Sequence, residues 1–213
     1  AEWSAAGDLD GDGALDVVFA SPEGYPAVWL NRFGSLSRFV EATDAWLGST
    51  ETFFSASRPI LLDLDQDGDL DLFPQQTIAW AHGTMAQWTA SPLTCRYFEN
   101  DGTRFVERSE VVAPHLLLDG PIAFGDLDND GDLDVVQVGK GFTVDAMGTP
   151  TVTGTSVPGE WRVLENGADG PGAPSFTDVT TSAFPFGTPN PYGTHVPGEG
   201  AAMADFDNDG WLD

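Results

Sequence analysis

The chain has 213 residues, with 34 acidic against 8 basic side chains and a formal net charge of −26. This charge argues against nucleic acid or an anionic membrane surface as a partner, and an apolar content of 41% excludes a disordered acidic tail. The 25 glycines and 15 prolines favour an all-β fold, and no apolar run reaches the length of a membrane span.

The first predicted element is an acidic loop, DLDGDGALD, which an apolar run follows directly. The pattern D-x-D-x-D-G-x-L-D occurs four times, at 8–16, 63–71, 126–134 and 205–213. The apolar runs that leave the first three loops are predicted to be short β-strands, at 15–20, 70–74 and 133–138. Four complete copies of one motif predict a repeat protein.

A second, weaker element follows each of the first three loops. It contains an asparagine and then a Phe-x-acidic-x-Thr/Ser frame, with the asparagines at Asn31, Asn100 and Asn166 and the frames at 39–43, 105–109 and 176–180. We therefore expect one region, 1–213, with repeats at 1–57, 58–120 and 121–199 and a partial repeat at 200–213. The length variation lies in the first half of each repeat, at 75–94 and 139–161. Insertions at equivalent positions usually emerge on one face, which makes that face a candidate for binding.

The acidic loops have the chemistry of a calcium site. Aspartates at positions 1, 3 and 5 of a tight loop converge, glycine at position 6 allows the turn, a carbonyl at position 7 adds a ligand and Asp at position 9 closes the site. The predicted carboxylate ligands are Asp8, Asp10, Asp12 and Asp16; Asp63, Asp65, Asp67 and Asp71; Asp126, Asp128, Asp130 and Asp134; and Asp205, Asp207, Asp209 and Asp213. The position-7 carbonyls are those of Ala14, Asp69, Asp132 and Trp211, and the side chains of Asp69 and Asp132 are expected to point to solvent.

Other readings of these loops fit less well. An EF-hand would need helical flanks and Glu at position 12, where this chain has Phe19, Pro74 and Gln137. Mg²⁺ avoids crowded all-protein cages, and zinc would need His or Cys at ligand spacing. Plain polar turns are the remaining alternative, which four complete copies argue against. We therefore predict up to four Ca²⁺ ions with a structural role.

The segment AAGDLDGDGALDVVFA at 5–20 resembles the FG-GAP/VCBS repeat family, the calcium-loop repeats of integrin-like β-propellers. The resemblance implies blades of four antiparallel strands, with a Ca²⁺ loop between the first two strands of each. It also implies an extracellular or cell-surface, bacterial setting. The chain resembles three blades and the start of a fourth, where seven blades is the family expectation. We expect the missing blades to come from a longer chain or from another chain.

The first functional hypothesis is a calcium-stabilised extracellular scaffold for adhesion, assembly or protein–protein interaction. The alternatives are a lectin-like, carbohydrate-binding propeller, or a non-catalytic module attached to a secreted polysaccharide-active enzyme. The carbohydrate alternative relies on aromatic residues of the insertions: Trp80, His82, Trp88, Phe142 and Trp161. No catalytic motif is present, so we expect no enzyme activity, although Asp145, Glu160 and Glu199 remain as carboxylates outside the loops.

Overall fold

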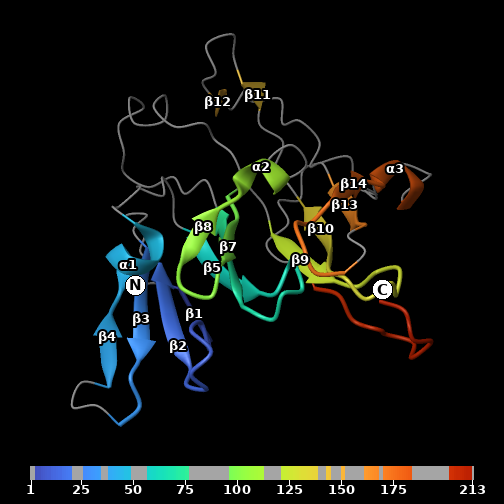
Figure 1. Cartoon of the computed structure of the whole chain (residues 1–213). Helices are drawn as coiled ribbons and strands as arrows, with labels where there is room; N and C mark the ends of the chain where they lie inside the picture. Colours follow the sequence, from blue (N-terminus) through green and yellow to red (C-terminus); the bar gives the residue numbers. More distant parts are fainter. Residues whose placement is uncertain are drawn as a thin grey trace. The chain divides into compact units, whose positions relative to one another are not determined.

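The computed structural model forms three four-stranded antiparallel sheets among the residues that it describes (Figure 1). The described residues are 3–20, 26–34, 38–48, 57–76, 96–112, 121–138, 143–144, 150–151, 161–167, 170–183 and 202–212. Only three short helices accompany the sheets within these ranges. The prediction of an all-β fold built from four-stranded antiparallel sheets is confirmed.

The first sheet has the order β1-β2-β3-β4. Its strands are β1 (Trp3–Gly7), β2 (Asp16–Ala20), β3 (Pro26–Asn31) and β4 (Phe39–Glu41), and α1 (Thr43–Leu47) follows. Burial alternates along β2, with Val18 fully buried and paired to Val28 of β3. This alternation suits a strand because successive side chains point to opposite faces, and the valines and Phe19 of β2 are residue types that favour strands.

The second sheet repeats this order with β5-β6-β7-β8. Its strands are β5 (Ser57–Leu62), β6 (Asp71–Gln76), β7 (Phe98–Asn100) and β8 (Phe105–Glu107), and α2 (Ser109–Val112) follows. β5 begins one residue before the predicted start of the second repeat at 58. The first two acidic loops thus connect the first two strands of their sheets, at β1–β2 and β5–β6.

The third sheet consists of β9 (Ile122–Gly125), β10 (Asp134–Val138), β13 (Trp161–Asn166) and β14 (Phe176–Asp178), and α3 (Thr180–Ala183) follows. A small two-stranded sheet of β11 (Thr143–Val144) and β12 (Pro150–Thr151) lies within the third-repeat insertion. The strands predicted to leave the first three loops correspond to β2, β6 and β10, which confirms that prediction.

The chain divides into two compact units, which we describe separately. The first unit is Ala1–His82 with Cys95–Glu110, and the second is Gly83–Thr94 with Val111–Asp213. The first unit holds the sheets β1–β4 and β5–β8 side by side (Figure 1). Their shared core is made of Leu9, Val18, Val28, Leu30, Trp46, Leu72, Phe98 and Phe105. Trp46 of α1 meets Phe105 of β8 edge to face, with ring centroids 5.2 Å apart, so the helix also helps to join the two sheets.

A glycine at the end of the first strand permits close contact between repeats. A Cβ on Gly7 would lie 2.5 Å from Leu70 Cδ1, which belongs to the second acidic loop. The same contact recurs in the second unit, where a Cβ on Gly125 would lie 2.7 Å from Leu212 Cδ1. In both cases the leucine at position 8 of one loop covers the residue just before the preceding loop.

The Phe-x-acidic-x-Thr/Ser frame forms the fourth, outermost strand of each four-stranded sheet and the start of the helix that follows it. Its hydroxyl accepts a backbone N–H from the third strand or the residue before it: Val28 to Thr43 at 3.0 Å, Tyr97 to Ser109 at 3.3 Å and Val163 to Thr180 at 2.9 Å. The hydroxyl residue also begins the short helix in each repeat. The frame therefore anchors the fourth strand and its helix to the third strand.

No helix in the described part of the chain is both long enough and apolar enough to cross a membrane.

Candidate metal centres

The four acidic loops share a left-handed backbone conformation at positions 4 and 6. Position 4 has a left-handed φ of 69° at Gly11, 60° at Gln66, 59° at Asn129 and 60° at Asn208. Position 6 is a glycine with φ between 84° and 101° in all four loops. Left-handed residues at both positions wind the loop tightly around its own side chains. The glycine at position 6 was predicted from the sequence, whereas the left-handed conformation at position 4 was not. Glycine or asparagine at that position is the usual sequence signal for it.

Hydrogen bonds from the loop backbone fix the carboxylates at positions 1 and 5. The position-6 glycine donates its N–H to position 1: Gly13 to Asp8 at 2.8 Å, Gly68 to Asp63 at 3.1 Å, Gly131 to Asp126 at 3.1 Å and Gly210 to Asp205 at 2.9 Å. The N–H of position 7 donates to position 5: Ala14 to Asp12, Asp69 to Asp67, Asp132 to Asp130 and Trp211 to Asp209. These bonds hold the carboxylates in place without any added ion.

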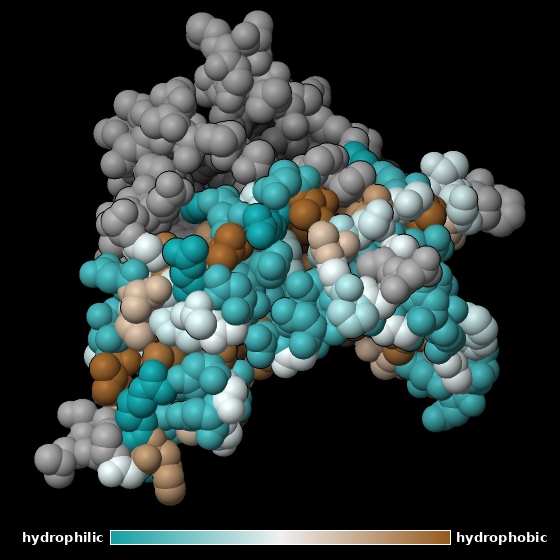
Figure 2. Space-filling view, viewed as in Figure 1, coloured by the Kyte–Doolittle hydropathy of each residue, from teal (hydrophilic) through white to brown (hydrophobic). Residues whose placement is uncertain are grey.

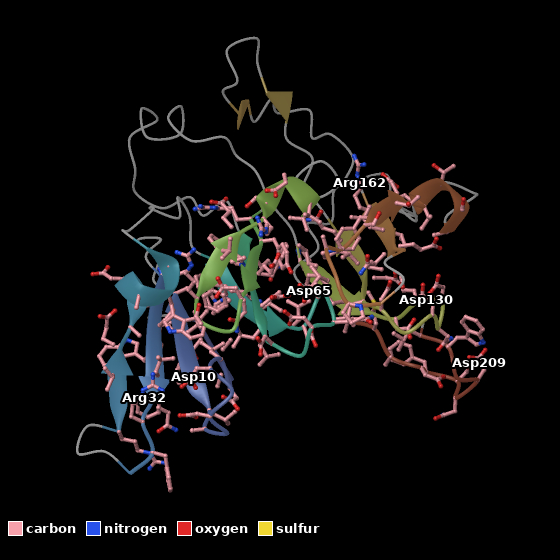
Figure 3. All side chains as sticks on the ribbon, viewed as in Figure 1. Asp10, Arg32, Asp65, Asp130, Arg162 and Asp209 are labelled. Atoms are coloured by element: carbon pink, nitrogen blue, oxygen red, sulfur yellow. The ribbon has the colours of Figure 1, made fainter. Side chains whose placement is uncertain are left out.

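Three carboxylates converge in every loop. One oxygen from each lies within 4.8 Å of the others, in the groups Asp8, Asp10, Asp16; Asp63, Asp65, Asp67; Asp126, Asp128, Asp134; and Asp205, Asp207, Asp209. Figure 3 shows Asp10, Asp65, Asp130 and Asp209, one from each loop. Of the predicted ligands, Asp12, Asp71 and Asp130 lie outside these groups, and Asp213 lies outside the described residues.

The aspartate at position 9 has a second role, as a link across its sheet. Asp16 is fully buried, and its two oxygens accept the N–H groups of Leu9 at 2.9 Å and Asn31 at 2.7 Å. Asp71 and Asp134 repeat both bonds, to Leu64 and Asn100 and to Leu127 and Asn166. Each of these three carboxylates therefore ties its loop to the end of the third strand of its sheet.

The asparagine that recurs in each repeat has a structural role that was not predicted from the sequence. Asn100 is fully buried, and its Nδ2 donates to the carbonyl of Leu70 in its own loop at 3.2 Å and to that of Leu9 in the first loop at 2.9 Å. The signal was present in the sequence, because Asn31, Asn100 and Asn166 recur in the same place before each Phe frame. One amide thus connects two acidic loops within the first unit.

Among the residues that the structure describes, two buried carboxylate oxygens of the clustered aspartates have no hydrogen-bond partner. They are Asp10 Oδ1 in the first loop and Asp63 Oδ1 in the second. A buried, ionised oxygen without a partner is costly, and a cation supplies the missing interaction. The donor set consists of oxygen atoms, as hard cations require. The residues of these loops therefore fit a bound divalent cation.

The electrostatics of the loops also favour a cation. Burial, and then the charge of Asp67, raises the pKa of Asp65 to about 6. Burial likewise raises the pKa of Asp71 to about 6, although hydrogen bonds from Asn100, Tyr97 and Leu64 act in the opposite direction. The surroundings of both carboxyl groups therefore disfavour the ionised form. A cation bound nearby would favour the ionised form again.

The first loop has a cation of its own. Arg32 Nη1 pairs with Asp10 Oδ2 and lies 3.6 Å from Asp12 Oδ2 (Figure 3). The hydrogen bond with Asp10 raises the pKa of the Arg32 guanidinium. The corresponding residues of the next two repeats are Asp101 and Gly167. The arginine partly neutralises the first loop, so this loop needs a metal ion less than a loop without such a pairing does.

One expectation about position 7 is wrong. The Asp132 side chain does not point to solvent, because it is only 3% exposed. Neither of its oxygens has a hydrogen-bond partner within the described part of the chain. Burial, and then the charge of Asp130, raises the pKa of Asp132 to about 6. Asp69 in the second loop is partly exposed, so the two position-7 aspartates have different environments.

The raised pKa values predict how stability depends on pH. Unfolded aspartates titrate near 3.8, whereas Asp65 and Asp71 titrate at about 6 in the folded protein. The folded state therefore binds more protons between these values, and these groups make metal-free protein more stable as the pH falls from about 7 toward 4. Calcium would have to displace those protons. The rise in melting temperature that calcium produces should therefore be smaller at about pH 5 than at about pH 7.5.

Thermal melts with and without calcium at both pH values measure this effect. The Asp65→Asn variant is the control, because it removes one of the titrating groups, and its calcium effect should vary less with pH. An equal calcium effect at both pH values in the unmodified chain would contradict the assignment.

The remaining sequence-based candidates lie outside the described side chains. They are Trp80, His82, Trp88, Phe142 and Trp161 of the carbohydrate hypothesis and the carboxylates Asp145, Glu160 and Glu199. The carbonyl ligands predicted at position 7 stay a prediction.

The fold and the loops together define a β-sheet repeat protein in which an acidic loop joins the first two strands of each four-stranded antiparallel sheet. A family model for the FG-GAP-like repeat matches residues 8–73, which span the first loop to strand β6. This match confirms the family resemblance predicted from the sequence. A comparison with curated proteins found no match.

Proposed function

We propose that this chain is a calcium-stabilised extracellular scaffold that mediates adhesion or assembly with another protein. The observation that carries the proposal is the convergence of three carboxylates in each loop, together with the buried Asp63 Oδ1, which has no hydrogen-bond partner among the described residues. FG-GAP-like repeats are generally calcium-binding and typically extracellular, and the match over 8–73 supports the same setting here. Extracellular calcium is abundant enough to fill sites of about 10⁻⁴–10⁻³ M affinity.

The role proposed for calcium is structural. The clustered carboxylates are held by backbone N–H groups, and the loop backbone in turn bonds to the neighbouring repeat through Asn100 and the carbonyl of Leu9. An ion that fixes one loop therefore also fixes its contact with the next sheet. Metal binding to the folded chain adds directly to the free energy of unfolding.

Calcium titration by calorimetry tests the proposal. Asp65→Asn should weaken calcium binding at one site by about tenfold, because it removes a charged ligand from a cluster of three carboxylates. Asp69→Asn is the matched control, since Asp69 lies in the same loop but outside the cluster, and it should bind calcium nearly as the unmodified chain does. Equal losses in the two variants would refute the ligand assignment.

The scaffold role has its own test. The calcium-loaded chain should bind no sugar on a glycan array, because a scaffold recognises a protein surface. Calcium-dependent binding of a defined glycan would instead favour the carbohydrate-binding alternative.

A further inference from the structure

The third acidic loop has two carboxylates beside its cluster of three. The clustered oxygens belong to Asp126, Asp128 and Asp134, so Asp130 at position 5 and Asp132 at position 7 lie outside the group. The two residues are held next to each other, because Asp132 N donates to Asp130 Oδ1 at 3.1 Å. A second, smaller acidic group therefore adjoins the cluster.

The Asp132 carboxylate is buried without a compensating partner. The residue is 3% exposed, and both carboxylate oxygens are buried and accept no hydrogen bond within the described part of the chain. After burial, the charge of Asp130 is the main cause that raises the pKa of Asp132, and direct contact between the two carboxyl groups contributes as well. An ionised oxygen in such a place destabilises the folded state unless a cation lies beside it.

The first loop shows how the carboxylate at position 5 can be compensated. There Asp12 also lies outside the cluster, and Arg32 Nη1 lies 3.6 Å from its Oδ2. In the third repeat the residue that corresponds to Arg32 is Gly167, and the neighbour of the position-5 carboxylate is Asp132. The third loop thus has a second negative group where the first loop has a positive one. A bound cation would supply the charge that the arginine supplies in the first loop.

Position 7 differs in the other three loops. Ala14 and Trp211 have no carboxylate at this position. Asp69 is partly exposed, and its Oδ2 lies against the turn between β7 and β8, where a Cβ on Gly102 would be 3.2 Å away. Among the described loops, a buried and unpartnered carboxylate at position 7 is therefore a feature of Asp132 alone.

We propose that Asp130 and Asp132 bind a second divalent cation in the third loop, beside the ion assigned to the cluster of three carboxylates. The site suits a hard cation such as Ca²⁺, because both side-chain donors are carboxylate oxygens. Asp130 is exposed, and the visible surface around the acidic loops is largely hydrophilic (Figure 2), so an ion and its water ligands can reach the pair from solvent. The site adds one ion to the four that the loops would bind, and it rests on the calcium binding proposed above.

Counting the bound ions tests the proposal. Equilibrium dialysis of the full chain with radioactive calcium, over about 0.01–10 mM free Ca²⁺, covers the affinities expected of extracellular sites. Asp132→Asn should bind one ion fewer at saturation than the unmodified chain, because it removes one of the two charged ligands. Asp69→Asn is the matched control at position 7 of the second loop and should bind the same number of ions as the unmodified chain.

Thermal melts give a second readout, in which the metal-free and calcium-loaded proteins respond in opposite directions. In excess EDTA at about pH 7.5, Asp132→Asn should raise the melting temperature by about 2–4 °C, because the neutral amide removes a buried charge and its repulsion by Asp130. In about 10 mM Ca²⁺ the same variant should melt below the unmodified chain, because the second ion no longer binds. A variant that melts higher under both conditions would contradict the proposal, since Asp132 would then be a buried charge without an ion.

Three results of the ion count would also overturn the proposal. The first is an unchanged count in Asp132→Asn while the loops bind calcium normally, in which case only the second site fails and the structural role of calcium stands. The second is weaker binding with an unchanged count, which would make Asp132 a ligand of the first ion. The third is an unmodified chain that binds no calcium, which would refute the structural role and the second site together.

Discussion

Replacing Asp71 by alanine should lower the free energy of unfolding of the metal-free protein by about 4 kcal/mol. The Asp71 carboxylate is fully buried and accepts three hydrogen bonds: from Leu64 N at 3.0 Å, Asn100 N at 2.8 Å and Tyr97 Oη at 2.8 Å. Alanine would leave these three donors buried without a partner, and each unpaired donor destabilises the folded state by about 1–3 kcal/mol. Part of this loss is offset, because the variant no longer has to bury a carboxylate. Denaturant unfolding in excess EDTA measures the change.

Two variants make this prediction specific. Asp67→Ala lies in the same loop but is exposed, and it should cost less than about 1 kcal/mol. Tyr97→Phe removes one of the orphaned donors, so the Asp71→Ala/Tyr97→Phe pair should lose less than the sum of the single losses. The prediction fails if the free-energy losses of Asp71→Ala and Tyr97→Phe are additive. It also fails if Asp71→Ala lowers the free energy of unfolding no more than Asp67→Ala does, because the buried network would then not hold the loop to β7.

Removing calcium should lower the melting temperature of the full chain by about 10 °C. Sites of about 10⁻⁴–10⁻³ M affinity add on the order of 1 kcal/mol each at about 2 mM Ca²⁺. Four such sites, at about 2–4 °C per kcal/mol for a chain of this size, give the expected shift. Chelation also restores repulsion among the clustered carboxylates of each loop. Melts in about 2 mM Ca²⁺ and in excess EDTA measure the difference.

The controls for this melt concern the identity of the ion. Adding back Ca²⁺ should restore the original melting temperature, whereas the same concentration of Mg²⁺ should restore little, since Mg²⁺ dehydrates reluctantly and requires strict octahedral geometry. Identical melts in Ca²⁺ and EDTA, with metal analysis finding no bound ion, would contradict the proposed role of the loops.

The sequence alone determined the repeat, the fold class and the convergence of loop carboxylates. These features are local: the ligands of one loop lie within nine consecutive positions, and glycine at position 6 sets the turn. The strands after the loops were also predictable, because each of the first three loops is followed by a short apolar run, such as Asp16–Ala20, that is rich in residues favouring strands. Local backbone chemistry therefore accounts for the correct predictions.

The tertiary structure decided the rest, because the deciding contacts are distant in sequence. Asn100 bonds to the carbonyl of Leu9, 91 residues away, and Asp16 bonds to the backbone of Asn31, 15 residues away. A residue's position in the motif also does not determine whether its side chain is buried. Asp132 is buried, although it occupies the same loop position as the partly exposed Asp69. A motif specifies the conformation of its own loop, whereas neighbouring strands, their register and the next sheet determine what covers each side chain and which polar groups find partners.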